Sequence, residues 1–158
     1  MSNKKIKRIK DLKKTVENLK RKGKKIVFTN GCFDILHIGH INYLRKAKAK
    51  GDILIIGLNS DDSVKKIKGK GRPLTSQNER AEILAALEFV DFVTIFEEET
   101  PLNLIKEIKP DVLVKGGDWK KEEVVGSDFV ESYGGKTALI PLVEGKSTSL
   151  IIEKIGRL

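Results

Sequence analysis

Cysteine is almost absent from this sequence. Its 158 residues contain a single cysteine, Cys32. One thiol cannot form a disulfide within the chain, so the small disulfide-stabilised folds of secreted proteins are excluded. A free thiol also agrees with a reducing compartment. We interpret Cys32 as a small residue that lies near the functional site.

Long apolar stretches are missing as well. The longest nearly uniform apolar run covers residues 53–58. That is the length of a strand, whereas a transmembrane helix needs about 20 apolar residues. The basic N-terminus is followed by no apolar segment of the kind that secretory signals contain. These absences predict a cytoplasmic protein with no membrane segment.

Basic charge is present in excess, but it is concentrated at the start of the chain. The net charge is +9, and the first 25 residues hold 12 of the 31 basic residues and only two of the 22 acidic ones. Leu12, Val16 and Leu19 follow helical spacing there, and Gly23 suits the end of a helix. We therefore predict a solvated basic helix over residues 1–23 rather than a nucleic-acid-binding arm, and no nucleic-acid partner.

Short β-rich runs alternate with helical patterns over residues 24–158. This alternation is typical of a parallel sheet that is covered by helices on both faces. We predict an α/β fold of the Rossmann-like, doubly wound type, in one compact domain. Its five parallel strands are expected at residues 25–29, 53–58, 92–96, 112–115 and 136–140. Residues 65–73 are rich in Lys and Gly and are expected to form a loop.

Two strand exits have an unusual composition. Ligands of an open α/β sheet bind beyond the carboxyl ends of the strands, where the strand order reverses. Residues 30–40 follow the first predicted strand and contain both histidines of the chain. Residues 116–119, which read Gly-Gly-Asp-Trp, follow the fourth. We expect the functional site between these two segments.

The two histidines, His37 and His40, are three residues apart. On a helix that begins near His37, both imidazoles share one face of the first turn, beside free backbone N–H groups. Gly39 leaves room for a phosphate to approach the backbone. Phosphate binding, metal binding and an ordinary surface role all remain open from the residues alone. A zinc site would need a third histidine or a second cysteine, so we expect no protein-bound metal.

Residues 31–40 resemble the signature of the His-x-Gly-His nucleotidyltransferase superfamily, the cytidylyltransferase-like proteins. The resemblance extends over about residues 24–156 and favours the small transferases over the longer aminoacyl-tRNA synthetases. The sequence is most similar to the adenylyltransferase domains of bacterial ADP-heptose synthases, which act in lipopolysaccharide core synthesis. Matching blocks follow the signature in the same order, at residues 59–61, 68–69, 72–73, 80–81, 85–87, 90–91, 100–101, 110–118 and 145–148.

The resemblance assigns roles to individual residues. It implies that His37 and His40 contact the triphosphate and stabilise charge as pyrophosphate leaves. It implies that Lys68, with Lys66 as the rival, reaches the α-phosphate or the sugar phosphate; a solvated charge run is the alternative. Nucleotide-binding positions implied in the same way are Cys32, Phe33, Gly39, Arg80, Gly117, Asp118, Ser147 and Thr148. Capping of the last helix would also account for Ser147 and Thr148.

The implied activity is transfer of AMP from ATP to a sugar 1-phosphate with release of pyrophosphate. D-glycero-β-D-manno-heptose 1-phosphate is the expected sugar, and Mg²⁺ would arrive with the nucleotide. The alternatives are a glycerol-3-phosphate-type cytidylyltransferase, a flavin or pantetheine adenylyltransferase, and a nucleotide-binding regulator without turnover. Ser149 and Leu142 depart from the threonine and the arginine that related cytidylyltransferases carry, which weakens the assignment to CTP.

The resemblance also implies partners. Related transferases form homodimers through the region that corresponds to residues 87–92, where this chain has Phe89, Val90 and Phe92. A role of these residues in the core alone is the alternative. A kinase domain is often fused to the transferase in this family. None is present in this sequence, so we expect that a separate sugar kinase supplies the substrate.

Overall fold

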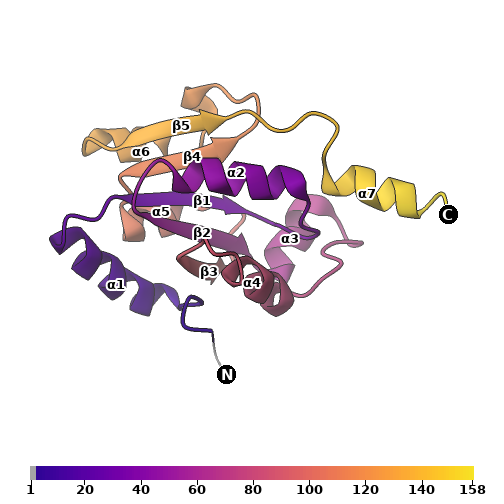
Figure 1. Ribbon diagram of the computed structural model, residues 1–158, viewed down its shortest axis with the longest axis horizontal. Coiled ribbons are helices and arrows are strands. Elements are labelled where there is room, and N and C mark those ends of the chain that lie inside the picture. Colours follow the sequence, from indigo (N-terminus) through magenta and orange to yellow (C-terminus); the bar gives the residue numbers. More distant parts are fainter. Residues whose placement is uncertain (1–2) are drawn as a thin grey trace.

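Five parallel strands form the centre of the computed structural model, which describes residues 3–158 (Figure 1). All four neighbouring pairs are parallel, and the strand order is β3-β2-β1-β4-β5. This confirms the predicted fold class, and each strand lies within two residues of its predicted position. The strands are β1 Ile26–Gly31, β2 Ile53–Asn59, β3 Phe92–Phe96, β4 Val112–Gly116 and β5 Lys136–Ile140.

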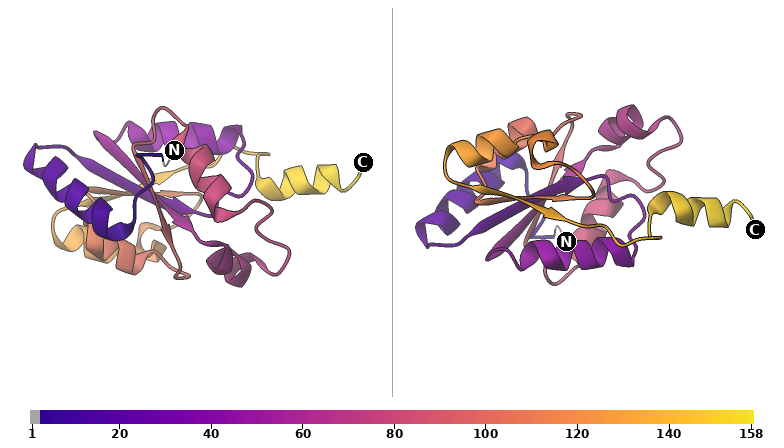
Figure 2. Two further views of the ribbon diagram at one scale, coloured as in Figure 1. Left: turned by 90° about the horizontal axis from the view of Figure 1, so that it is seen from below. Right: turned by 90° about the horizontal axis from the view of Figure 1, so that it is seen from above.

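Helices cover both faces of the sheet (Figure 2). Helices α2 and α4 pack on one face, and α1, α5 and α6 pack on the other. The last helix, α7, leaves the body at the carboxyl edge of the sheet and buries none of its residues. The helices are α1 Ile9–Arg21, α2 Ile38–Lys48, α3 Asp61–Lys68, α4 Gln77–Ala85, α5 Leu102–Ile108, α6 Ser127–Ser132 and α7 Thr148–Ile155, with a short 3-10 turn at Lys121–Glu123.

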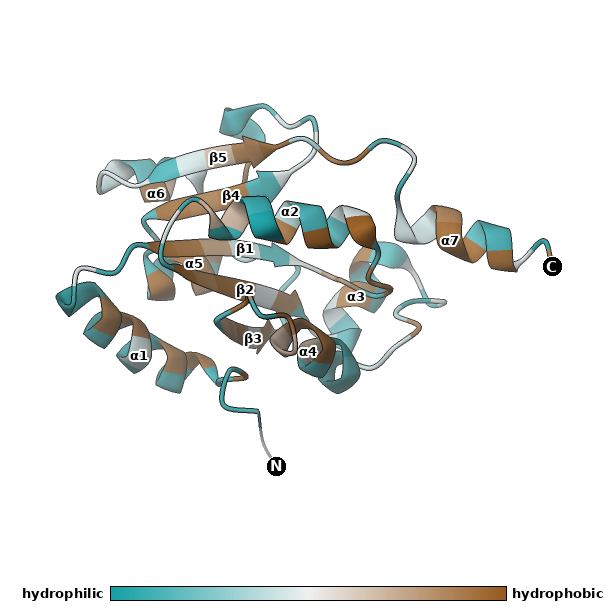
Figure 3. Ribbon diagram, viewed as in Figure 1, coloured by the Kyte–Doolittle hydropathy of each residue, from teal (hydrophilic) through white to brown (hydrophobic). Residues whose placement is uncertain are grey.

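Apolar side chains of the strands alternate between two core clusters. Val27 of β1 points to the α2 and α4 side, and its neighbours Ile26 and Phe28 point to the α1 and α5 side. The alternation follows the two-residue period of a strand. Both sets are buried, so β2 and the first half of β1 are apolar, whereas β1 ends in Thr29, Asn30 and Gly31 (Figure 3). Doubly covered parallel sheets require this pattern.

Helix α3 corrects one expectation. Residues 65–73 are not a loop throughout, because α3 continues to Lys68 and the loop begins at Gly69. The hydroxyl of Ser60 caps the first turn by accepting from the Ser63 N–H. The acidic residues of α3 lie in its first turn and its lysines in its last turn. At these positions negative and positive charges, respectively, interact favourably with the helix dipole. These local interactions make a lysine-rich segment helical.

The basic N-terminal helix is part of the folded body. Leu12 and Val16 of α1 are buried in the same cluster as Ile26 and Phe28, so the predicted apolar stripe packs against the sheet. Before α1, residues 5–7 run along the edge strand β3. Val93 donates a backbone hydrogen bond to Lys5 O and accepts one from the Lys7 N–H, both at 2.9 Å.

Strands β1 and β4 lie side by side but separate toward their carboxyl ends. Strand β1 pairs with β2 over six residues and with β4 over only two, the last pair being Phe28 with Leu113. Beyond this pair, the Tyr43 hydroxyl lies 2.6 Å from Thr29 Oγ1 and donates to Val114 O at 3.3 Å. The order in which the chain adds strands also changes here: β2 and β3 are added on one side of β1, and β4 and β5 on the other. A crevice therefore opens at the point where open α/β sheets bind ligands.

No helix in residues 3–158 is long and apolar enough to cross a bilayer.

Replacement of Leu12 tests whether α1 contributes to the core. Leu12→Ala removes a fully buried side chain and should lower the free energy of unfolding by about 2 to 4 kcal/mol, as measured by urea denaturation. Lys14→Ala changes an exposed residue of the same helix and should stay within about 0.5 kcal/mol of the unmodified protein. Equal stability of the two variants would show that α1 is not docked in solution.

Candidate active site

A cleft of about 650 Å³ lies at the carboxyl edge of the sheet, above the separation of β1 and β4. Its wall comes from the ends of β1, β2 and β4, the start of α2, the end of α3 and the start of α7. Eight of the twelve predicted site residues line it: Cys32, Phe33, His37, Gly39, His40, Lys68, Ser147 and Thr148. Lys66, Arg80, Gly117 and Asp118 lie outside the lining.

The first turn of α2 is built around the two histidines. His37 is the N-cap residue, and its Nδ1 accepts from the Gly39 N–H at 3.1 Å. His40 Nδ1 accepts from the His37 N–H at 3.3 Å. The two rings are in contact at a tilt of 36°, with 3.9 Å between their centroids. The histidines therefore form a reciprocal cap of the kind usually made by Ser and Glu.

This cap fixes the protonation of both imidazoles. Because each Nδ1 accepts a hydrogen bond, each neutral ring carries its proton on Nε2. Burial, with a further contribution from His37, lowers the pKa of His40 to about 4. Burial and the charge of Lys146 also lower the pKa of His37. At neutral pH both side chains are uncharged, and each has an Nε2–H group that the cap leaves free to donate.

Gly39 is required by the geometry of His37. A Cβ at position 39 would lie 2.9 Å from His37 Nδ1 and 2.8 Å from its Cε1. Any side chain there would push the ring out of its capping position. Gly31 has a similar role, since its Cβ would lie 2.9 Å from the Phe33 ring, which packs against His40 with 5.4 Å between ring centroids.

Several cations of the cleft lie near Cys32. Burial raises the pKa of the Cys32 thiol, and the nearby charges of Lys68 and Arg72 act in the opposite direction. Burial lowers the pKa of Lys115, which also lies close to Lys68. Lys68, Arg72 and Lys115 all line the cleft. Their combined positive potential suits a substrate with several phosphates.

Lys66 and Arg80 occupy different surroundings. Lys66 is exposed on α3 and does not reach the cleft lining, so Lys68 is the better placed of the two rival lysines. Arg80 is only 1% exposed. It donates to the carbonyls of Cys32 and Asn59, at 2.6 and 2.9 Å, and pairs with Asp61 at 2.7 Å. It lies behind the cleft and connects the ends of β1 and β2.

The loop after β4 bends sharply at Gly117. Gly117 has a φ of 110° and donates a backbone hydrogen bond to Ile140 O. Asp118 is exposed outside the cleft lining. Trp119, the only tryptophan, does line the cleft, and its ring lies 5.9 Å from Lys115 Nζ. The indole ring of Trp119 is therefore the aromatic surface that this loop contributes to the cleft.

The start of α7 closes the cleft opposite the strands. Ser147 is the N-cap, and its hydroxyl accepts from the Leu150 N–H at 3.1 Å. Thr148 donates through Oγ1 to Ile35 O at 3.0 Å, which ties α7 to the histidine loop. Both hydroxyls therefore have structural partners, and both residues line the cleft as well.

Residues 28–153 match the Cytidylyltransferase-like family. The chain belongs to that family. It is 58% identical over 156 residues to the "Bifunctional protein HldE" of Geobacter metallireducens (strain ATCC 53774 / DSM 7210 / GS-15), covering 99% of this chain and 32% of that protein. The chain thus spans about a third of the length of the curated relatives it matches.

Two solved structures share the fold. The lipopolysaccharide core biosynthesis protein of Thermoplasma volcanium GSS1 superposes with a TM-score of 0.64 at 28% identity, covering 78% of this chain and all of that one. A pantoate-beta-alanine ligase of Francisella tularensis superposes with a TM-score of 0.62 at 19% identity, covering 97% of this chain and 78% of that one. The second likeness supports the fold alone.

Arg72 and Lys115 are residues of this Cytidylyltransferase-like cleft that the sequence did not single out as site residues, and Trp119 lay in an expected site segment without a role of its own. All three belong to blocks that carry the resemblance or lie directly beside one. Arg72 and Trp119 are loop residues, and the direction of a side chain in a loop follows from the tertiary contacts; Lys115 is the next-to-last residue of β4. Among residues 3–158, no group of three or more His, Cys, Asp or Glu side chains is arranged to bind a metal ion.

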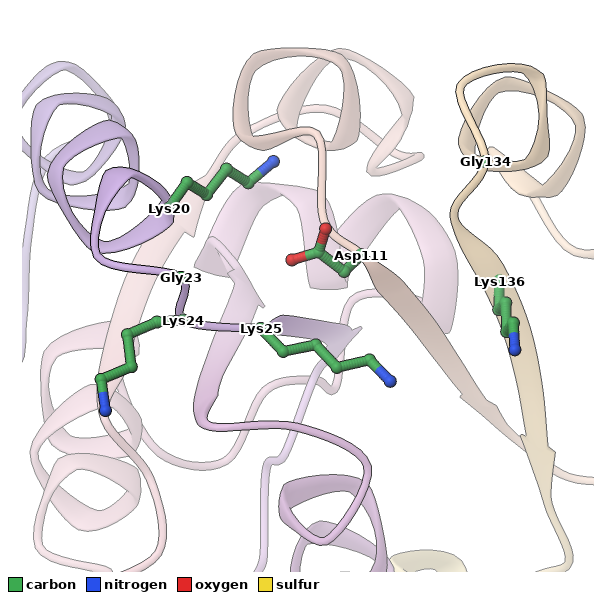
Figure 4. A pocket seen from close by; sticks show the side chains of 7 residues that line it. All are labelled: Lys20, Gly23, Lys24, Lys25, Asp111, Gly134 and Lys136. Carbon is green, nitrogen blue, oxygen red and sulfur yellow. The ribbon is translucent and has the colours of Figure 1, made fainter.

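A second hollow, of about 520 Å³, lies at the opposite edge of the sheet (Figure 4). It is lined by Lys20, Lys24, Lys25, Asp111 and Lys136 together with two glycines. Asp111 accepts from the Ile26 N–H at 2.7 Å, so its carboxylate fastens β1 to β4. No predicted site residue lies there, and both histidines line the cleft at the other edge.

Histidine titration provides a direct test of the cap. In NMR spectra of the free protein, His40 should titrate near pH 4 and His37 below its ordinary pKa of 6.5, both in the Nε2–H form. Because the folded pKa of His40 is depressed, its contribution to stability is complete above about pH 6.5 and falls as the pH decreases toward 4. His37→Asn assigns the signals. Two histidines that both titrate near 6.5 would contradict the cap.

Proposed function

We propose that this chain transfers AMP from ATP to D-glycero-β-D-manno-heptose 1-phosphate and releases pyrophosphate. The observation that supports it most is the cleft itself, which two neutral imidazoles and a group of cations line together at the switch point of a Cytidylyltransferase-like domain. The high identity to HldE proteins and the likeness to a lipopolysaccharide core biosynthesis protein support the choice of sugar.

The reaction needs no catalytic base. The phosphate of a sugar 1-phosphate is already ionised at neutral pH, and one of its oxygens attacks the α-phosphorus of ATP. A P–O bond forms there as the bond from the α-phosphorus to the oxygen bridging to the β-phosphate breaks, and pyrophosphate leaves with the electron pair. Catalysis then consists of positioning and of stabilising negative charge.

His37 and His40 would stabilise the departing pyrophosphate. Their Nε2–H groups are preorganised by the cap and cost no reorientation during the reaction. A neutral imidazole stabilises the bound triphosphate of the ground state less than a fully charged group would. The growing charge on pyrophosphate therefore strengthens these hydrogen bonds in the transition state more than in the ground state.

Lys68 and Lys115 would bind the phosphates that stay near β1. Lys115 is held in the sheet end, whereas Lys68 ends α3 beside the loop, so the two approach the cleft from different elements. Ser147 and Thr148 at the start of α7 lie near the histidine loop, and Trp119 offers its ring to a base or a sugar. Gly117 and Asp118 would contribute to nucleotide binding by shaping the loop after β4 that carries Trp119.

Mg²⁺ would come bound to the triphosphate. The Asp34 carboxylate in the cleft wall is engaged in several hydrogen bonds, and no cluster of carboxylates exists among the described residues to hold a metal. The oxygen ligands that Mg²⁺ requires would therefore be supplied mainly by the phosphates, whose charge the metal would partly neutralise.

Cytoplasmic location and the separate sugar kinase remain predictions.

The activity is tested by incubating the protein with ATP or CTP, Mg²⁺ and a panel of sugar 1-phosphates, with pyrophosphate as the readout. ATP with heptose 1-phosphate should give the highest kcat/KM. His40→Ala should lower kcat by about 100- to 1000-fold, or about 3 to 4 kcal/mol, with a smaller effect on ATP affinity.

Lys46→Ala, on the exposed side of the same helix, is the control and should keep full turnover. ATP binding without pyrophosphate release from any sugar would instead indicate a nucleotide-binding regulator. A His40→Ala protein with a normal unfolding midpoint and near wild-type turnover would remove the role given to this histidine.

A homodimer through residues 87–92 remains a prediction. Val90 is buried, and Leu87, Phe89 and Phe92 pack partly against the two core clusters. What this segment offers to a partner is therefore the outer part of those side chains and the exposed Glu88. Light scattering at micromolar concentration should give twice the mass of one chain, and Glu88→Arg should shift it toward the monomer. A monomeric unmodified protein would show that the segment serves the core alone.

A further inference from the structure

Arg72 lies in the loop between α3 and α4, and its side chain lines the cleft with 18% exposed. Its Nε donates to Asp34 Oδ2 at 2.7 Å. Within residues 3–158, its two terminal nitrogens have no hydrogen-bond partner. A guanidinium has five N–H donors, of which four belong to the terminal nitrogens. Arg72 therefore brings four unused donors to a cleft that also contains His40 and Lys68.

Asp34 fixes the direction of this guanidinium. Its side chain is fully buried and accepts from the Leu74 N–H at 2.9 Å and the Thr75 N–H at 3.0 Å, in addition to Arg72. Burial alone would raise the pKa of Asp34, but the hydrogen bonds from Leu74, Thr75 and Arg72 outweigh it and the pKa is lowered. The carboxylate is thus ionised at neutral pH. It lies three residues before His37, so it joins the Arg72 loop to the histidine loop.

Arg80 shows the contrasting case. Its Nε donates to Thr75 O, its Nη1 to the carbonyls of Cys32 and Asn59, and its Nη2 to Asp61. Four of the five N–H donors of this guanidinium have protein partners, and the side chain is buried, so Arg80 is not placed to bind a ligand. The resemblance pointed to Arg80 as the arginine near the phosphates. By geometry, the arginine that is free to bind them is Arg72.

We propose that Arg72 is a further substrate-binding residue, whose terminal nitrogens bind a phosphate group in the cleft, with Asp34 as its positioning residue. The inference rests on the proposed function, because it names a contact to the substrates of that reaction. A planar guanidinium held at Nε presents its other edge for a two-point contact, which matches the oxygens of a phosphate. The phosphate belongs either to ATP or to the sugar 1-phosphate.

Arg72→Gln should lower kcat/KM for one of the two substrates by about 10- to 100-fold, and the affected substrate identifies the phosphate. Lys70→Gln is the matched control, because Lys70 is an exposed cation of the same loop that does not line the cleft. It should leave both kcat/KM values within about two-fold. Asp34→Asn should raise the KM for the same substrate that Arg72→Gln affects.

Binding is measured separately from turnover. Trp119, the only tryptophan, lines the cleft, so its fluorescence reports titrations with ATP and with heptose 1-phosphate. Arg72→Gln should weaken one of these titrations by at least 10-fold relative to Lys70→Gln. An effect no larger than that of the control on either ligand would overturn the proposal, even if the unfolding midpoint falls.

Arg72→Lys is the second variant, used if Arg72→Gln does not fold. It keeps the charge but loses the fork, so its loss in affinity should lie between that of Arg72→Gln and none. Wild-type affinity and turnover in Arg72→Lys would also overturn the proposal. A wild-type protein that binds ATP but releases no pyrophosphate would count against the proposed function alone, because the binding titrations still decide the role of Arg72.

Discussion

The site depends on the separation of β1 from β4. A parallel sheet normally satisfies its own backbone groups, so two adjacent strands can part only where other groups replace the lost hydrogen bonds. Tyr43 does this for one backbone group, because its hydroxyl donates to Val114 O while it also contacts the side-chain Oγ1 of Thr29. Burial raises the pKa of Tyr43 to about 12, so the hydroxyl stays protonated and keeps its donor. Without this hydroxyl the carbonyl of Val114 would lose a hydrogen-bond donor beside the crevice.

Around that crevice, permanently charged side chains and neutral hydrogen-bond donors line the same cleft. Lys68, Arg72, Lys115 and Lys146 supply permanent charge, and the two histidines supply neutral donors. Fixed cations attract a polyphosphate at long range, whereas neutral donors respond to charge that develops locally. Asp34 connects the two kinds of group, since it binds Arg72 and lies in the loop that carries the histidines.

The sequence was sufficient to predict the fold, and eight of its twelve candidate site residues line the cleft. Apolar β-branched runs marked the strands, because burial on both faces leaves few other compositions. His37, Gly39 and His40 were recognisable because their spacing has a local cause, the first turn of α2. The roles of Arg72 and Arg80 were not, because which arginine lies inside depends on contacts with Asp34 and Asp61, distant in sequence. Lys66 and Lys68 both lie in α3 and differ in the direction they take from the helix, since only Lys68 lines the cleft.

The segment before α1 has a consequence for the behaviour of the protein at high concentration. Strand β3 is the outermost strand on its side, and an open strand edge can pair with the edge of another molecule. Residues 5–7 occupy part of that edge through Val93, and their lysines bring charge to it. Intermolecular sheet extension is thereby disfavoured at this edge. The N-terminal segment thus contributes to colloidal stability as well as to the core.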